Sequence, residues 1–226
     1  MTTVVLVRHG LTEMTGPLLA GWTPDLHLDE RGQRQAVAVA ERLSGVAFHA
    51  IVSSPLDRCL ETAQAIAGER EVLQDERLGE CRYGDWTGKA LKDLAKDPMW
   101  KVVQQHPSAA VFPGGEALRD TQSRAVAAVR DWNAKLGADA TWLACSHGDV
   151  IKAITADALG LHLDQFQRIV IDPCSVTVVR YTDTRPFVLR VNDIGSVADL
   201  LPAPKKSRRR KASADAPVGG GAGPDA

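Results

Sequence analysis

The chain has 226 residues, of which 44% are hydrophobic and 24% are charged, and its formal net charge is −1. This size and composition are typical of a globular protein with one main, well-buried core. No stretch reaches the roughly 18 to 20 uninterrupted apolar residues that span a bilayer, so we expect no membrane segment. The four cysteines show no Cys-x-x-Cys spacing, which favours reduced thiols. Since no leader precedes the first expected strand, we expect a cytoplasmic protein.

The net charge conceals an asymmetry between the body of the chain and its tail. The segment Pro202–Ala226 carries six basic and two acidic residues, which leaves 21 basic and 26 acidic residues, a net of −5, in the rest. An acidic body argues against a nucleic-acid-binding surface on the fold itself. The tail is basic and then rich in glycine, proline and small residues, so it cannot bury apolar surface. We therefore expect residues 202–226 to be a disordered, low-complexity tail.

The expected elements alternate between strand and helix. Apolar, β-branched runs predict strands, and helical periodicity with capping residues predicts helices. In chain order these elements are a strand at Thr3–Val7, a helix from about Glu30 to Leu43 capped by Asp29, a strand at Ala50–Val52, a helix opened by the capping hydroxyls of Ser53-Ser54-Pro55 and reaching about Ala67, a strand at Glu71–Leu73, a helical piece near Leu91–Val103, a helix at Glu116–Leu136, a strand at Thr141–Cys145, a helix at Val150–Leu159, and strands at Val176–Tyr181 and Phe187–Val191.

This alternation predicts an α/β fold, a three-layer sandwich in which a mainly parallel sheet carries helices on both faces. The last two strands form a hairpin that adds an antiparallel edge. The stretch 78–120 is rich in glycine, proline and tryptophan, and we expect a small, partly helical insertion there, near the functional site. The α/β domain is expected to span residues 1–201.

Two of the expected strands end in a histidine. The string Leu6-Val7-Arg8-His9-Gly10 closes the first strand, and Cys145-Ser146-His147-Gly148 closes a strand far along the chain. Because ligands of an α/β sheet bind outside the carboxyl ends of its strands, both imidazoles can reach one pocket. Arg8 and Arg58 lie at similar junctions, where guanidinium groups and helix-start N–H groups favour phosphate oxygens. The pattern indicates phosphoryl chemistry.

Further motifs follow these strings in an order that resembles one family. They are Gly21-Trp22 with Leu28–Ala36, Ser53–Ala63, Leu78–Gly88, Pro113-Gly114-Gly115-Glu116, and Ser146-His147-Gly148. Over about Val4 to Tyr181 the chain resembles the histidine phosphatase superfamily, in the branch that includes the cofactor-dependent phosphoglycerate mutases and related phosphatases. Five ordered motifs make chance a poor explanation.

The resemblance implies a phosphatase that hydrolyses phosphomonoesters through a phosphohistidine intermediate. His9 would be the nucleophile, kept neutral because Arg8 and Arg58 depress its pKa. His147, protonated or donating when phosphate is bound, would join the two arginines in neutralising charge on the phosphate oxygens. Glu80 would be the general acid and then the general base, with a raised pKa.

The substrate-binding residues that the resemblance implies are Arg8, Thr15, Gly21, Arg58, His147 and Gly148, with no metal and no cofactor. The chain departs from the family pattern at Thr15, where asparagine is common, and at Ala20, where a polar residue is common. It also lacks, between Glu80 and Pro113, the adjacent arginine pair with which the mutases hold a second acidic group. We therefore expect a phosphatase, with a phosphoglycerate mutase-type phosphotransferase as the alternative.

Other functions stay open at this point. A phospho-ligand-binding protein of the same fold would keep the pocket without its chemistry. A metal hydrolase with His9, His147 and Glu80 as ligands is disfavoured, because the chain lacks the usual paired histidine spacings and the arginines would repel a cation. The expected partner is a small phosphorylated substrate, and the basic tail offers the only plausible contact to nucleic acid. The sequence singles out neither a substrate nor an oligomeric state.

Overall fold

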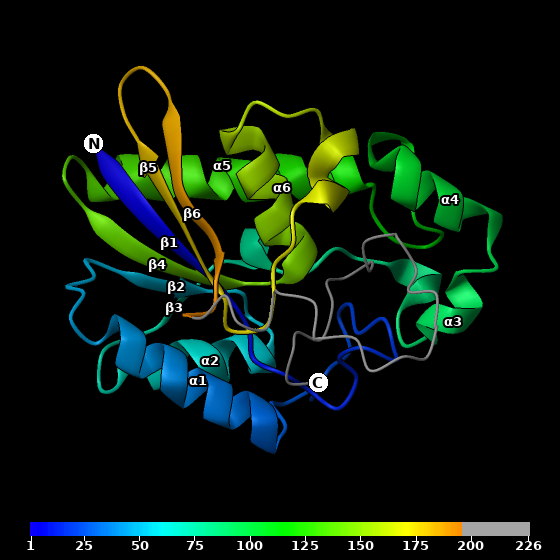
Figure 1. Cartoon of the computed structure of the whole chain (residues 1–226), viewed down its shortest axis with the longest axis horizontal. Helices are drawn as coiled ribbons and strands as arrows, with labels where there is room; N and C mark the ends of the chain where they lie inside the picture. Colours follow the sequence, from blue (N-terminus) through cyan, green and yellow to red (C-terminus); the bar gives the residue numbers. More distant parts are fainter. Residues whose placement is uncertain (196–226) are drawn as a thin grey trace, which may run out of the picture.

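The structure, a computed structural model, describes residues 1–195 and builds them around one six-stranded sheet (Figure 1). The strand order is β3-β2-β4-β1-β5-β6. The strands are β1 Thr2–Arg8, β2 Ile51–Ser53, β3 Leu73–Gln74, β4 Thr141–Ser146, β5 Val176–Tyr181 and β6 Pro186–Asp193. The pairs β1–β4, β2–β4 and β2–β3 are parallel, whereas β5 runs antiparallel to both β1 and β6. The predicted fold class is confirmed, including its antiparallel edge.

Helices cover both faces of the sheet, as expected for three layers (Figure 1). On one face lie α1 Glu30–Leu43 and α2 Asp57–Ala67, and on the other lie α5 Leu118–Leu136 and α6 Gly148–Ala158. Side chains of a strand alternate between faces. In β1, Val4 and Leu6 accordingly pack with the core beneath α5 and α6, and Val5 and Val7 with the core beneath α1 and α2. This is why β1 reads as an unbroken apolar run.

The stretch between β3 and α5 forms the predicted insertion, but with two short helices where one helical piece was expected. These are α3 Leu91–Leu94 and α4 Pro98–Gln105. Pro98 cannot continue a helix from the preceding turn, and the side chain of Asp97 caps α4 by accepting the backbone N–H of Met99 at 2.9 Å. In Figure 1 the two helices lie beyond the end of the sheet.

Three helix starts differ from the predictions. α2 begins at Asp57, after Leu56, and the Ser54 hydroxyl accepts the N–H of Leu56 at 3.3 Å while it also bonds His147 at 2.8 Å. α5 begins at Leu118, and the side chain of Glu116 before it accepts the N–H of Arg82 at 2.8 Å and the guanidinium of Arg124 at 2.6 Å. α6 begins already at Gly148. The short strand β3 also lies one to two residues later than predicted.

The predicted basic tail, residues 202–226, lies outside the described residues. Within residues 1–195, no helix is both long enough and apolar enough to cross a membrane.

Candidate active site

The sheet brings the two histidines together. β1 and β4 are parallel neighbours in register, with Arg8 opposite Ser146, so the next residue of each strand leaves the sheet at the same edge. The backbone N–H of His9 donates to the carbonyl of Ser146 at 3.0 Å. The imidazole centroids of His9 and His147 are 5.2 Å apart. The expectation that distant strings of the chain meet at one edge is met.

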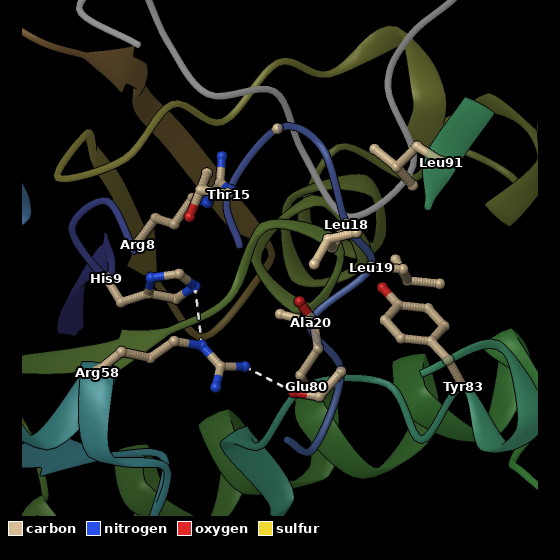
Figure 2. A pocket seen from close by; sticks show the side chains of 12 residues that line it. Arg8, His9, Thr15, Leu18, Leu19, Ala20, Arg58, Glu80, Tyr83 and Leu91 are labelled. Carbon is tan, nitrogen blue, oxygen red and sulfur yellow. Dashed lines mark hydrogen bonds between the residues drawn. The ribbon is translucent and has the colours of Figure 1, made fainter. Parts of the chain in front are cut away.

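The pocket at this edge opens over His9 (Figure 2). Its lining residues come from the end of β1, the following loop, α2 and the insertion: Arg8, His9, Thr15, Gly16, Leu18, Leu19, Ala20, Gly21, Arg58, Glu80, Tyr83 and Leu91. The predicted site residue His147 is fully buried and is not among these lining residues.

The environment of His9 leaves one ring nitrogen available to attack. Nδ1 lies 2.7 Å from the carbonyl oxygen of Gly10, so it carries the proton and donates. Nε2 therefore has the lone pair, and it accepts from Nε of Arg58 at 3.3 Å. Burial, followed by the charges of Arg58 and Arg8, lowers the pKa of His9 well below its usual range. The direction is the predicted one, although burial is the largest cause.

Gly10 allows this geometry because its backbone passes very close to α1. A Cβ at this position would lie 2.6 Å from the carbonyl oxygen of Gly32, closer than such atoms approach. The N–H of Gly10 donates to the hydroxyl of Thr62 on α2 at 3.1 Å. The carbonyl that orients His9 is thus fixed between two helices.

Arg58 holds the centre of the site. It is the second residue of α2, and only 1% of its surface is exposed. One terminal nitrogen donates to the carbonyl of Gly21 at 2.7 Å and lies 3.4 Å from Nδ1 of His147. The other terminal nitrogen is buried and has no hydrogen-bond partner among the described residues. A buried guanidinium N–H without a protein acceptor is suited to an anionic ligand.

Arg8 is also buried, and the segment before β5 anchors its side chain. Its Nη1 donates to the carbonyl of Ile171 at 2.8 Å. Burial lowers its pKa from the ordinary value, and the nearby carboxylates of Glu80 and Asp172 act in the opposite direction. Two guanidinium groups therefore converge on the pocket that contains His9.

His147 is held by polar contacts on both ring nitrogens. Nε2 lies 2.8 Å from the hydroxyl of Ser54, and Nδ1 lies 4.0 Å from Oε2 of Glu80. Burial, then the charge of Arg58, lowers its pKa well below the usual range. His147 is therefore neutral in the unliganded protein, and a bound dianion would favour its protonation.

Glu80 is placed as a buried carboxyl group beside these cations. Only 4% of its surface is exposed, and Oε1 accepts the backbone N–H of Cys81 at 2.9 Å. Burial and, next, the charge of Asp149 raise its pKa from 4.5 to about 7, while Arg58 and Arg8 lower it. A carboxyl with this pKa can give and take a proton near neutral pH.

The remaining predicted substrate-binding residues are placed differently. Thr15 and Gly21 line the pocket. The hydroxyl of Thr15 is engaged by Thr12, through the backbone N–H at 3.0 Å and the hydroxyl at 2.9 Å. Gly148 is buried as the first residue of α6 and is absent from the pocket lining.

The sequence analysis missed a buried polar network next to Glu80. The hydroxyl of Tyr83, a pocket residue, donates to Asp149 at 2.8 Å, and Lys152 contacts the other oxygen of Asp149 at 3.4 Å. Lys152 also donates to Gln167 at 3.1 Å. The sequence signal for this network was the spacing of Asp149 and Lys152, which lie one helical turn apart directly after His147.

Across residues 1–195 there is no group of three or more His, Cys, Asp or Glu side chains arranged to hold a metal ion.

Comparison with known proteins assigns the family. The family model for the histidine phosphatase superfamily (branch 1) matches residues 4–194. The chain is 29% identical over 209 residues to phosphoserine phosphatase 1 of Hydrogenobacter thermophilus, covering 85% of this chain and 92% of that protein. It is 32% identical over 165 residues to a 2,3-bisphosphoglycerate-dependent phosphoglycerate mutase of Mesorhizobium japonicum, covering 67% of this chain and 79% of the mutase.

A solved structure is similar over the same region. Phosphoserine phosphatase from Entamoeba histolytica, in complex with 3-phosphoglyceric acid, aligns with a TM-score of 0.78 and 26% identity, covering 86% of this chain and 98% of that chain. Sequence and structure agree that this chain belongs to the histidine phosphatase superfamily.

Proposed function

We propose that this protein is a phosphatase that hydrolyses phosphomonoesters through a phosphohistidine on His9. The observation that carries the proposal is the state of His9: a neutral, buried imidazole whose Nε2 lone pair faces the pocket beside Arg58. Family membership and the phosphatases among its relatives support the same activity.

In the first step, Nε2 of His9 attacks phosphorus and the bond to the leaving oxygen breaks. Glu80 gives its proton to that oxygen, so the leaving group departs as a neutral alcohol. In the second step, Glu80 takes a proton from water, the water oxygen bonds to phosphorus, and the bond between phosphorus and Nε2 breaks. Inorganic phosphate is released, and both side chains return to their starting states.

The cations next to His9 would stabilise the charge of the transferring group. Arg58 supplies its buried, unpartnered N–H, and Arg8 supplies a second guanidinium. His147, once protonated by the approach of the dianion, would add a third donor. These groups are fixed before substrate binds, so little reorganisation is needed in the transition state.

The chemistry needs no metal, because the arginines and His147 supply the positive charge that a metal would otherwise provide. We also propose a cytoplasmic location, which the four free, buried thiols support. The expected partner is a small phosphorylated molecule.

The test is phosphate release from a panel of phosphomonoesters, with and without EDTA. Full activity in EDTA is expected. Substrate should label the protein transiently with a phosphoryl group that is labile in acid and stable in alkali. Loss of this label in His9→Ala, with a loss of turnover of at least about a thousandfold, would identify the intermediate. Substantial activity in His9→Ala contradicts the proposed nucleophile. Strong turnover of phosphoglycerate that depends on 2,3-bisphosphoglycerate priming would favour the mutase-type alternative.

A further inference from the structure

The pocket has two chemically different sides. Around His9 it presents the guanidinium groups and the carboxyl of Glu80. Figure 2 shows the other side, where apolar side chains face this polar group. We call this side the apolar wall; its residues are Leu18, Leu19, Ala20 and Leu91. The transferring phosphoryl group belongs with the cations, so the leaving alcohol must lie toward the apolar wall.

The apolar wall is a built part of the fold, since main-chain hydrogen bonds join its two segments. The N–H of Leu91 donates to the carbonyl of Pro17 at 3.0 Å, and the N–H of Leu19 donates to the carbonyl of Lys89 at 3.0 Å. The N–H of Gly88 returns a bond to the carbonyl of Leu19 at 2.7 Å. The loop after β1 and the insertion are thereby fixed to each other, and the leucines keep their place.

Among residues 1–195, the lining on this side holds no cation for a second acidic group on the substrate. Of the residues described as lining the pocket, the only cations are Arg8 and Arg58, which lie beside His9. The guanidinium of Arg82, next to Tyr83 in the chain, stacks over the ring of Trp22 at 3.8 Å and pairs with Glu76 at 3.7 Å. Lys89 and Lys92, within two residues of Leu91, are exposed and do not line the pocket.

The hydroxyl groups of the pocket are also engaged. Tyr83, which lies beside Leu19 in Figure 2, donates its proton to Asp149, and the hydroxyl of Thr15, beside Arg8, is bonded to Thr12. The remaining ionisable group of the described lining that can face the alcohol, Glu80, is an acid and supplies no positive charge to a second anion. A carboxylate on the leaving group would lose water without gaining a partner.

We propose that the substrates are phosphomonoesters of uncharged alcohols whose carbon skeleton packs on the apolar wall, and that a second anionic group on the alcohol is rejected. This inference rests on the proposed phosphatase function and names the substrate class of the same site. Leu18 and Leu91 are the residues that set the specificity.

The decisive measurement compares benzyl phosphate with 4-carboxybenzyl phosphate on the full chain. The two alcohols have nearly the same shape and reactivity, and they differ in one carboxylate. We expect kcat/KM for benzyl phosphate to be higher by about tenfold or more, because an unpaired carboxylate costs at least that factor. Equal or faster turnover of the carboxylated substrate overturns the inference.

A variant tests whether the apolar wall is responsible. Leu91→Arg adds a cation where the alcohol lies, so the preference for benzyl phosphate is expected to shrink by about tenfold, through faster turnover of the carboxylated substrate. Leu91→Gln is the matched control, similar in length but neutral, and it should keep the preference. Val111→Arg places the same charge on an exposed side chain outside the pocket and should also keep it.

The outcomes separate the two proposals. If phosphate is released from benzyl phosphate but Leu91→Arg changes both substrates equally, the phosphatase stands and the assignment of the wall fails. If no phosphomonoester of the panel is hydrolysed, the proposed function fails and this inference fails with it.

Discussion

The alkaline limit of turnover tests how the fold tunes Glu80. Burial and the charge of Asp149 raise its pKa from 4.5 to about 7, against the cations Arg58 and Arg8 and the N–H of Cys81. This difference, about 2.5 units, corresponds to about 3 kcal/mol in favour of the protonated carboxyl. In the proposed mechanism the protonated form is the general acid, so kcat/KM for a substrate with a poor leaving group is expected to fall above about pH 7.

The perturbation is Asp149→Asn, which removes a negative charge and so lowers the pKa of Glu80. A return of the pKa to its ordinary value of 4.5 would move the alkaline limb toward acid by about 2.5 units. At pH 7 the protonated fraction would then drop from about one half to about 0.3%, a loss of roughly a hundredfold in kcat/KM. Below the limb the two enzymes are expected to converge.

The assay is the pH profile of phosphate release from benzyl phosphate, with 4-nitrophenyl phosphate alongside. For 4-nitrophenyl phosphate, whose leaving group needs little protonation, Asp149→Asn should move the alkaline limb of the pH profile less. Ionisation of the substrate is common to both enzymes and cancels in the comparison. Asp183→Asn makes the same change on the exposed β5–β6 hairpin and should leave the limb in place. An unmoved or more alkaline limb in an Asp149→Asn protein that is folded by circular dichroism would refute the tuning of Glu80.

Three further substitutions probe the site and the core. Arg58→Lys removes the planar fork that contacts His9 and, in the proposed mechanism, holds the phosphate, so kcat/KM is expected to fall by about a hundredfold or more in phosphate-release assays, while a wild-type rate would contradict the placement. Leu6→Ala opens a cavity in the fully buried centre of β1 and should cost about 2–5 kcal/mol in urea unfolding; a loss below about 1 kcal/mol would argue against this packing. Lys152→Met leaves the buried carboxylate of Asp149 without its cation, and we expect a loss of about 3–5 kcal/mol by the same measurement, whereas unchanged stability would show that the pair is not needed.

The sequence was sufficient for the sheet and for the groups that it delivers. Strands that end in His9 and His147 could be placed at one edge, because parallel strands share their carboxyl ends, and the ordered motifs predicted the family. The approximate positions of the main helices followed from periodicity. Glu80 lies in an irregular segment, so only its place in a family motif singled it out.

What the sequence could not show depends on contacts between distant segments. The hydroxyl of Ser54 was expected to serve the start of α2, where it accepts the N–H of Leu56, but its second bond, to the imidazole of His147 93 residues later, could not be foreseen. Asp149 and Lys152 look like an ordinary surface pair on a helix, and their burial follows only from the packing of α6. The apolar wall arises because residues near Leu18 pair with residues near Leu91 outside any regular strand.

The place of β1 in the sheet has a consequence for synthesis on the ribosome. β1 is made first, yet both of its neighbours, β4 and β5, come from Thr141–Ser146 and Val176–Tyr181. Until those residues emerge, the nascent chain carries an apolar strand with two unpaired edges, the kind of segment that chaperones shield from aggregation. Chains stalled before β4 should therefore bind holdase chaperones through their first residues and show no activity. Release of the complete chain should end chaperone binding and produce activity.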